Sequence, residues 1–218
     1  MEKVCILFDA SNFYHLVLRK LGIQEVEFDF EAFARFLAGE RAIIREGKRF
    51  YVATVREGYE SKKAMSNQTS LLTKLSNMPE KWIIKTSTLR TRIEKIEIDK
   101  RVINYEKLLE LGIKEVYHKK SREKGIDVKI ATDLIIGAFD NKYDTAILVS
   151  SDTDLVPAID EVRNRFQRKV EYVGFSIPKN EIYEATEPTN GMIRRTDTKR
   201  VLIEADIKPF IIKSLFKK

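Results

Sequence analysis

Short apolar runs alternate along the chain with amphipathic stretches in which apolar residues recur every three or four positions. The apolar runs predict strands at residues 4–8, 49–55, 81–86, 145–150 and 169–174. Because these runs are continuous rather than interrupted by polar residues, they are typical of strands buried on both faces of a parallel sheet.

The amphipathic stretches predict helices between most of these strands. The predicted helices cover residues 12–21, 30–37, 61–77, 103–111, 126–139 and 154–166. Strands that alternate with helices favour a mainly parallel sheet covered by helices on both faces. The predicted fold class is therefore α/β, an α/β sandwich that is Rossmann-like in the loose sense.

Two of the predicted strands end in acidic and amide side chains. Residues 147–156 read ILVSSDTDLV, so an apolar run ends at Asp152 and Asp154. The first predicted strand runs into Asp9 in the same way, and Asn12 follows. Open parallel sheets place their ligand sites at the carboxyl ends of their strands, so we expect these side chains to share one site.

The helix that begins near Gly125 supplies a further carboxylate. Asp127 projects into the apolar stripe of this helix, where a carboxylate is not expected. A crossover helix runs antiparallel to the strands it joins, so its N-terminus brings Asp127 toward Asp9 and Asp152, and four carboxylates are predicted to converge. The stripe consists of Ile126, Ile130, Ala131, Leu134, Ile135 and Ala138.

Such a cluster of carboxylates favours a bound cation. Like charges raise one another's pKa unless a cation neutralises them or protons are shared, and a metal is the simpler account. Carboxylate, amide and water oxygens suit Mg²⁺ or Mn²⁺ rather than Zn²⁺. The two histidines, His15 and His118, are not spaced as a zinc pair. We therefore expect Mg²⁺ or Mn²⁺ as the cofactor.

Each of these residues also has a structural interpretation. Asp127 and Asp154 could each be the N-cap of a helix, because Asp is a preferred capping residue. Either Asn12 or Ser11 could cap the first helix. Asp133 lies about 9 Å further along its helix than Asp127, at ~1.5 Å rise per residue, so a supporting or structural role is favoured for it.

The composition fits one soluble domain. With 218 residues, of which 43% are hydrophobic, the chain is long enough for one good core. The single cysteine, Cys5, lies inside an apolar run, which excludes a disulfide framework and favours a reducing compartment. No apolar run approaches the ~18 residues of a membrane span, and the N-terminus lacks the pattern of a signal peptide. We expect a cytoplasmic protein without a membrane partner.

Charge is unevenly distributed along the chain. Residues 125–187 hold seven basic and twelve acidic side chains, residues 86–124 hold eleven and seven, and residues 188–218 hold eight and three. The basic segments are either solvated surface or a polyanion-binding surface that borders a metal-loaded acidic site. We expect a main domain at residues 1–178 and a basic C-terminal extension at residues 179–218, packed on the same domain.

One competing motif is that of the haloacid-dehalogenase-like phosphatases. In that motif an apolar strand ends in two Asp residues that are separated by one residue. Asp152 and Asp154 fit it superficially. That chemistry needs a downstream Lys and an acidic pair after further strands, whereas only about 60 residues follow here and none forms such a pair. The phosphatase is the less favoured alternative.

Three motifs together resemble the NYN domain, the PIN-like nuclease family that includes LabA-like proteins. In order along the chain they read VCILFDASNFY, KGIDVKIATDL and YDTAILVSSDTDLVPAI, within residues 3–175. The resemblance implies a PIN-like three-layer α/β/α sandwich and metal-dependent ribonuclease chemistry. One departure is Ser151, where the family usually has Gly, and it affects the turn that presents Asp152.

The resemblance also implies the roles of individual residues. One or two divalent ions would activate a water and stabilise the charge that develops on a phosphodiester. Asp9, Asp127 and Asp152 would hold metal, Asp154 would be a further ligand or accept a proton from water, and Asn12 would orient a ligand water or phosphate. Asp133 matches a recurring acid of the second motif and is an additional candidate metal ligand.

Basic residues that precede Asp127 are placed to draw a phosphate backbone toward this site. The candidates are Arg90, Arg92, Lys119, Lys120, Arg122 and Lys124. The expected partner is RNA, with single-stranded DNA and a homodimer left open. The alternative function is an RNA-binding or adaptor protein that keeps the fold and has little or no catalysis.

Overall fold

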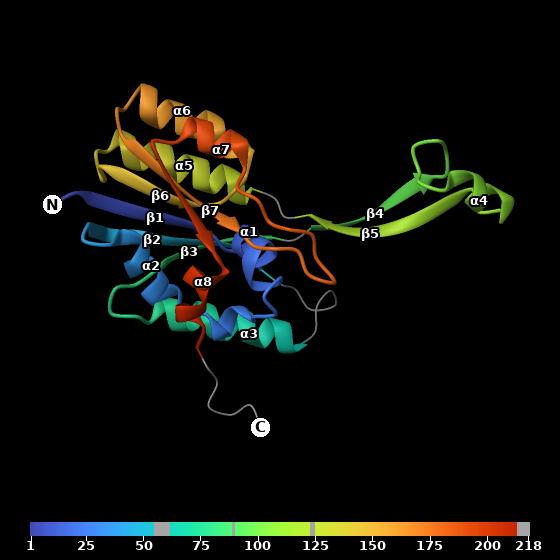
Figure 1. Ribbon diagram of the computed structural model, residues 1–218, viewed down its shortest axis with the longest axis horizontal. Coiled ribbons are helices and arrows are strands. Elements are labelled where there is room, and N and C mark those ends of the chain that lie inside the picture. Colours follow the sequence, from blue (N-terminus) through green and yellow to red (C-terminus); the bar gives the residue numbers. More distant parts are fainter. Residues whose placement is uncertain (55–61, 89, 123–124, 213–218) are drawn as a thin grey trace.

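A sheet of six parallel strands forms the centre of the protein, and helices cover both of its faces (Figure 1). The computed structural model describes residues 1–54, 62–88, 90–122 and 125–212, and for residues 88, 90, 91 and 120–122 it describes the backbone alone. The strands lie in the order β3-β2-β1-β6-β7-β8, and all neighbours are parallel. Their bounds are Lys3–Asp9 (β1), Ala42–Thr54 (β2), Ile83–Thr88 (β3), Thr145–Val149 (β6), Lys169–Ser176 (β7) and Thr198–Ile203 (β8).

The helices form two layers, one on each face of the sheet, so the predicted three-layer α/β/α sandwich is confirmed (Figure 1). One layer contains α2 (Phe30–Ala38), α3 (Lys62–Ser76) and the short α8 (Glu204–Ile207). The other contains α5 (Ile126–Phe139), α6 (Val156–Asn164) and α7 (Asn190–Arg195). A short α1 (Ala10–Phe13) continues into a π-helical turn at Tyr14–Leu18, and 3₁₀ turns lie at Glu25–Glu27, Thr153–Leu155 and Lys208–Phe210. No described helix has the length and apolar character needed to cross a membrane.

Residues of β1 alternate between two cores, one under each helical layer. Phe8 points into an aromatic core, where its ring lies 5.1 Å from that of Phe13 and 5.3 Å from that of Phe30. Leu7 points into the opposite core, against α5. Both residues are fully buried, which is why the strand reads as a continuous apolar run.

The apolar stripe predicted for α5 is confirmed. Ile126, Ile130, Leu134 and Ala138 are all buried in the core between α5 and the sheet. The helix begins after Gly125, whose φ of +85° is costly for any residue with a Cβ atom. Gly125 therefore sets the point at which Asp127 enters the helix.

The five predicted strands are present, but β2 begins at Ala42 rather than near residue 49. It pairs with β1 from Ala42 to Tyr51, and the register shifts between Val4 and Ile6. At the shift Glu46 has a φ of 59°, and a Cβ atom on Gly47 would lie 2.6 Å from the Cγ1 atom of Ile44. Charged residues and a glycine form this irregular turn, and they also interrupt the apolar pattern. The pattern therefore did not predict the first part of the strand.

The C-terminal segment packs on the same sheet. Strand β8, which the apolar pattern did not predict, pairs with β7 as an edge strand, and only Leu202 of its six residues is buried. Beyond it, the Phe210 ring lies 5.2 Å from the Phe33 ring, and its carbonyl accepts a 2.8 Å hydrogen bond from the backbone of Asp29. Few buried positions explain why a hydrophobic pattern did not reveal this strand.

We expect Phe210→Ala to lower the free energy of unfolding by about 2 kcal/mol, because it removes an aromatic ring that closes the core over α2. Urea unfolding followed by circular dichroism would measure the change. Phe139→Ala is the control, because it removes the same aromatic ring from a side chain that is 64% exposed. It should lower the free energy of unfolding by less than half as much. Equal losses in the two variants would show that the C-terminal segment does not stabilise the domain.

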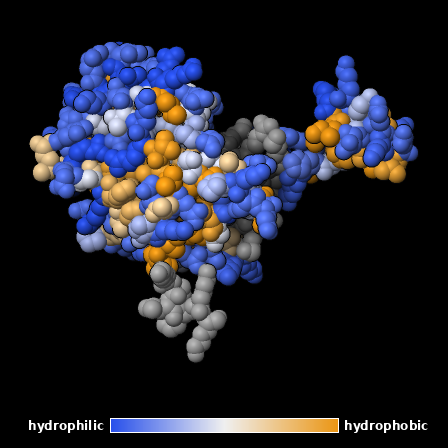
Figure 2. Space-filling view, in the orientation of Figure 1, coloured by the Kyte–Doolittle hydropathy of each residue, from blue (hydrophilic) through white to orange (hydrophobic). Residues whose placement is uncertain are grey.

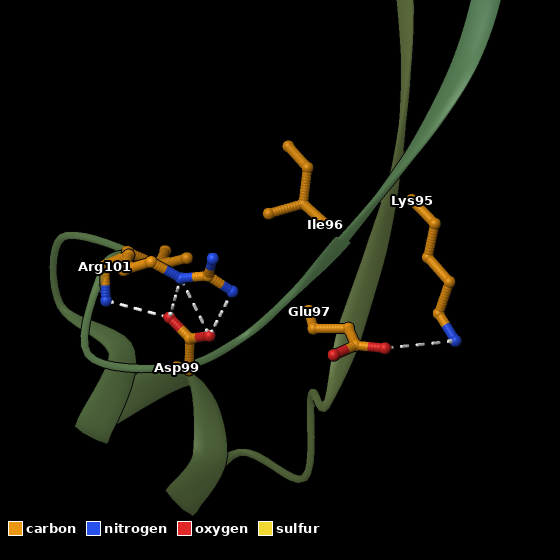
Figure 3. A pocket seen from close by; sticks show the side chains of 6 residues that line it. Lys95, Ile96, Glu97, Asp99 and Arg101 are labelled. Atoms are coloured by element: carbon orange, nitrogen blue, oxygen red, sulfur yellow. Dashed lines mark hydrogen bonds and ion pairs between the residues drawn. The ribbon is translucent and has the colours of Figure 1, made fainter.

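A second, two-stranded antiparallel sheet stands away from the sandwich (Figure 1). It consists of β4 (Arg90–Glu97) and β5 (Glu115–Arg122), with α4 (Tyr105–Glu110) near its far end, and these residues 90–122 are called the arm. Hydrophobic side chains are exposed on the arm (Figure 2). Ile93 and Tyr117 of the arm are 72% and 66% exposed. A hollow of about 400 Å³ lies at the far end, where Arg101 forms a two-pronged ion pair with Asp99 (Figure 3).

Candidate active site

Asp9 and the residues after β6 meet at the carboxyl edge of the sheet. Strands β1 and β6 are neighbours, with Phe8 paired to Val149, so Asp9 lies beside Ser150. Asp9 is 4% exposed, and its Oδ2 atom accepts a 3.0 Å hydrogen bond from the Ser150 hydroxyl. Its Oδ1 atom accepts a 3.0 Å bond from the backbone of Asn12, so Asp9 is the N-cap of α1. The alternatives that Ser11 or Asn12 caps this helix are therefore wrong.

A chain of hydrogen bonds shapes the turn after β6. The Ser150 hydroxyl, which donates to Asp9, also accepts a 3.3 Å bond from the backbone N–H of Asp152. The next residue, Ser151, donates its backbone N–H to the Asn12 side-chain oxygen at 3.0 Å. Asp9 and Asn12 thus act on the conformation of the segment that carries Asp152.

Asp152 begins the 3₁₀ turn that leads into α6. Its Oδ1 atom accepts a 2.9 Å hydrogen bond from the backbone of Asp154, which makes Asp152 the N-cap. Asp154 is exposed in the first turn and caps no helix, so the capping alternative for Asp154 is wrong. The carboxylate of Asp154 is left facing solvent beside that of Asp152.

Asp127 joins this edge from the first turn of α5. The N-cap of α5 is Gly125, so the capping alternative for Asp127 is also wrong. Burial raises the pKa of Asp127, and the negative charges of Asp152 and Asp154 and a hydrogen bond with the Asp152 side chain raise it further. Two carboxyl groups are thus in contact, and a third is close enough to repel them.

The structure brings together Asp127 and Asp152, places Asp154 nearby and ties Asp9 to the same turn through Ser150. Within residues 1–54, 62–88, 90–122 and 125–212, no three Asp, Glu, His or Cys side chains converge tightly enough to surround an ion. The predicted convergence of four carboxylates is therefore wrong for the described residues, although neighbouring carboxylates such as Asp127 and Asp152 suit a divalent ion that keeps several waters as ligands. Mg²⁺ in particular is usually bound by one or two carboxylates together with waters and substrate phosphates.

Asp133 lies apart from this group. Its carboxylate accepts a 2.6 Å hydrogen bond from the Tyr51 hydroxyl and pairs with Lys85 at 2.8 Å and Arg49 at 3.2 Å. Burial would raise the pKa of Asp133, but the hydrogen bonds from Lys85 and Tyr51 and the charge of Arg49 outweigh it, and the pKa is lowered. These contacts link α5 to β2 and β3.

Two of the basic candidates, Arg92 and Lys119, are exposed on the arm. The register of the arm pairs Arg92 with Lys120 and Arg90 with Arg122 along its backbone. The side chains of Arg90, Lys120 and Arg122, and all of Lys124, lie outside the described residues. These basic positions lie at the end of the arm that is nearest to α5 in the chain, and Lys119 pairs there with Ile93.

Two residues that the sequence did not single out also touch this site. The Tyr172 hydroxyl lies 2.8 Å from the Ser151 hydroxyl, and the Thr189 hydroxyl donates to the carbonyl of Ser151 at 3.1 Å. Tyr172 lies within an apolar strand, so its hydrophobic neighbours masked it. A polar hydroxyl in a fully buried strand was the one available signal.

A parallel α/β sandwich with neighbouring carboxylates at the carboxyl edge of its sheet is consistent with the PIN-like class of nuclease domain. The family model of the NYN domain matches residues 3–190, and the chain belongs to this family. NYN domains are PIN-like nuclease domains that generally use divalent metals and bind RNA. No curated protein matches the sequence.

One similar solved structure is that of a protein of unknown function from Vibrio parahaemolyticus. It shares 20% sequence identity with this chain, and the alignment covers 92% of this chain and 93% of the other, with a TM-score of 0.54. At this identity the likeness supports the fold alone.

We expect Asp127→Asn to raise the thermal stability of the metal-free protein at pH 7. Because the pKa of Asp127 is raised in the folded protein, ionising this carboxyl is less favourable there than in the unfolded chain. The stability of the protein is therefore fully present below the unfolded pKa of Asp127, and part of it is lost as pH rises through the folded pKa. Asn does not ionise and avoids this loss. Because Asp127 is partly exposed, the midpoint should rise by about 2 °C or less.

Thermal unfolding in EDTA would measure this difference at pH 7 and again at about pH 3, where Asp127 is protonated in both states and the difference should vanish. A variant that unfolds at a lower temperature than the wild type at pH 7 would contradict the unfavourable contact between Asp127 and Asp152.

Proposed function

We propose that this NYN domain is a metal-dependent ribonuclease that hydrolyses RNA phosphodiester bonds at the edge formed by Asp127, Asp152 and Asp154. The observation that carries the proposal is that Asp127 and Asp152 lie close together at the carboxyl edge of the sheet, where burial and then the charge of Asp152 raise the pKa of Asp127. Membership of the NYN family favours this function over the haloacid-dehalogenase-like phosphatase. Two carboxyl groups in contact are unfavourable on their own, and a cation between them would remove the repulsion.

In the proposed mechanism, Asp127 and Asp152 would hold Mg²⁺ or Mn²⁺, and Asp154 would supply a further ligand or accept a proton from water. Bound at this edge, the ion would supply the charge that activates water and stabilises the transition state. Asp9, which is buried, would be a further metal ligand, and the two hydrogen bonds that it accepts also hold the turn that carries Asp152. Asn12 orients the same turn by accepting a bond from Ser151.

The arm would bring the substrate to this edge. Its basic positions precede α5 in the chain, and Asp127 lies in the first turn of that helix. Cationic side chains there would bind RNA phosphates and release counterions. Exposed Tyr117 and Ile93 add an apolar surface on the arm that bases or a protein could contact.

We expect wild-type protein to cleave end-labelled RNA in Mn²⁺ or Mg²⁺ and to be inactive in EDTA. Asp152→Asn should lower the cleavage rate about 100-fold or more, because it removes a carboxylate that would hold the ion. Asp140→Asn is the matched control, because Asp140 is an exposed acid that follows the far end of α5, and it should cleave like the wild type.

A panel of single-stranded and stem-loop RNAs with single-stranded DNA would identify the substrate. If no member of the panel is cleaved and both wild type and Asp152→Asn bind RNA equally, the protein is an RNA-binding or adaptor protein instead.

We expect the double variant Arg92→Ala, Lys119→Ala to bind RNA more weakly and with a smaller dependence on salt. Each lost phosphate contact reduces the slope of log affinity against log salt by about 0.7 for a single strand, so two lost contacts reduce it by about 1.4. Fluorescence anisotropy at several salt concentrations would measure the slope. The control double variant Lys100→Ala, Lys107→Ala removes the same charge from the far end of the arm. If it weakens RNA binding as much as Arg92→Ala, Lys119→Ala does, RNA does not bind specifically near Arg92 and Lys119.

A further inference from the structure

Ser151 is held at each of its three polar groups by a different part of the chain. Its backbone N–H donates to the Asn12 side chain at 3.0 Å, and its carbonyl accepts from the Thr189 hydroxyl at 3.1 Å. Its own hydroxyl lies 2.8 Å from that of Tyr172. A Gly at this position would form the two backbone bonds but not the third. The hydroxyl pair is therefore specific to the Ser in this chain.

Tyr172 is built into the sheet so that its hydroxyl reaches this turn. It is fully buried in β7, and its hydroxyl also accepts a 3.2 Å hydrogen bond from the backbone of Thr189. A Cβ atom on Gly174 would lie 2.6 Å from the Tyr172 hydroxyl and 2.7 Å from the ring carbon that carries it. Gly174 thus leaves the space that the end of the Tyr172 side chain occupies, and the buried ring has little freedom to move.

The segment after β7 closes over the same turn. Thr189 contacts both Ser151 and Tyr172, and it is the N-cap residue of α7. Two residues later, a Cβ atom on Gly191 would lie 2.9 Å from the Cγ2 atom of Thr153. Residues 189–191 therefore pack directly against residues 151–153, on either side of Asp152.

We propose that Tyr172 and Thr189 are positioning residues that fix Asp152 through Ser151, an inference that rests on the proposed nuclease function. Ser151 is covalently joined to Asp152, so fixing its N–H, carbonyl and hydroxyl sets the direction in which the Asp152 carboxylate leaves the backbone. That direction brings Asp152 into contact with Asp127 on a different element. In a site with few carboxylates, small displacements of one of them change the affinity for an ion.

Four variants test the proposal. Tyr172→Phe and Ser151→Gly each remove one hydroxyl of the pair. The double variant combines them. Tyr143→Phe is the matched control, because Tyr143 is also a buried tyrosine, and its hydroxyl donates a 2.5 Å hydrogen bond to the carbonyl of Leu134, within α5. It removes a comparable bond elsewhere in the same core.

The first measurement is amide hydrogen exchange of residues 150–154 in the metal-free protein. Exchange should rise about 10-fold in Tyr172→Phe and in Ser151→Gly and stay unchanged in Tyr143→Phe. The second is direct binding of Mn²⁺, followed by electron paramagnetic resonance, in which both variants should bind about 10-fold more weakly. The double variant should resemble Tyr172→Phe, because that variant already removes the hydroxyl pair together with the bond from the Thr189 backbone.

The third measurement is steady-state cleavage of RNA, in which both variants should lower kcat and leave KM within about twofold, since the RNA-binding surface is untouched. If Tyr172→Phe and Tyr143→Phe are alike in exchange and in Mn²⁺ binding, Tyr172 has only a structural role and the proposal is overturned. If the wild type binds Mn²⁺ but cleaves no RNA, the nuclease function fails, and exchange and Mn²⁺ binding still decide the positioning role. A wild type that binds no Mn²⁺ would overturn both.

Discussion

The pairing of β1 with β6 is the constraint on which the rest of the structure depends. It joins the first strand to one that follows 141 residues later, and the hydrogen bonds that tie Asp9 and Asn12 to the turn after β6 depend on it. Asp9 bonds to Ser150 because their strands are neighbours in register. Ser150 then binds the backbone of Asp152, and Asn12 binds Ser151. A shift of one residue between the strands would turn Asp9 away from this edge.

The carboxyl edge of the sheet that carries Asp127, Asp152 and Asp154, here called the acidic edge, contains contacts that destabilise the fold. Asp127 lies on the face of α5 that packs toward the sheet, where an apolar side chain would fit the stripe on either side of it. By contrast, Asp133 on the same helix is neutralised by Lys85 and Arg49. Two carboxylates on one helix thus have opposite environments. Carboxyl groups that repel one another, like Asp127 and Asp152, are typical of functional sites. Carboxylates that are neutralised by basic side chains, like Asp133, support the fold.

The sequence predicted those parts of the structure that bury apolar residues in a regular pattern. The central strands and the stripe of α5 followed from burial on both faces, and Asp127 stood out as an exception to that stripe. Strand β8 and the two strands of the arm escaped prediction because their residues are mostly exposed and mix charges with apolar side chains, whereas the helix predicted at residues 103–111 is present as α4. Tyr172 and Thr189 escaped because their roles depend on contacts between distant segments, and a single sequence does not encode such pairings in any local pattern.

The arm and the acidic edge also differ in how far apart their contacting residues lie along the chain. All the strand pairs of the arm form within residues 90–122, whereas the acidic edge joins residues 9, 127 and 152. Contacts that are local in sequence form early and fast, and those that close long loops form late. A growing chain would therefore fold its arm well before it had an acidic edge, because that edge does not exist until β6 and the turn after it have been synthesised and paired with β1.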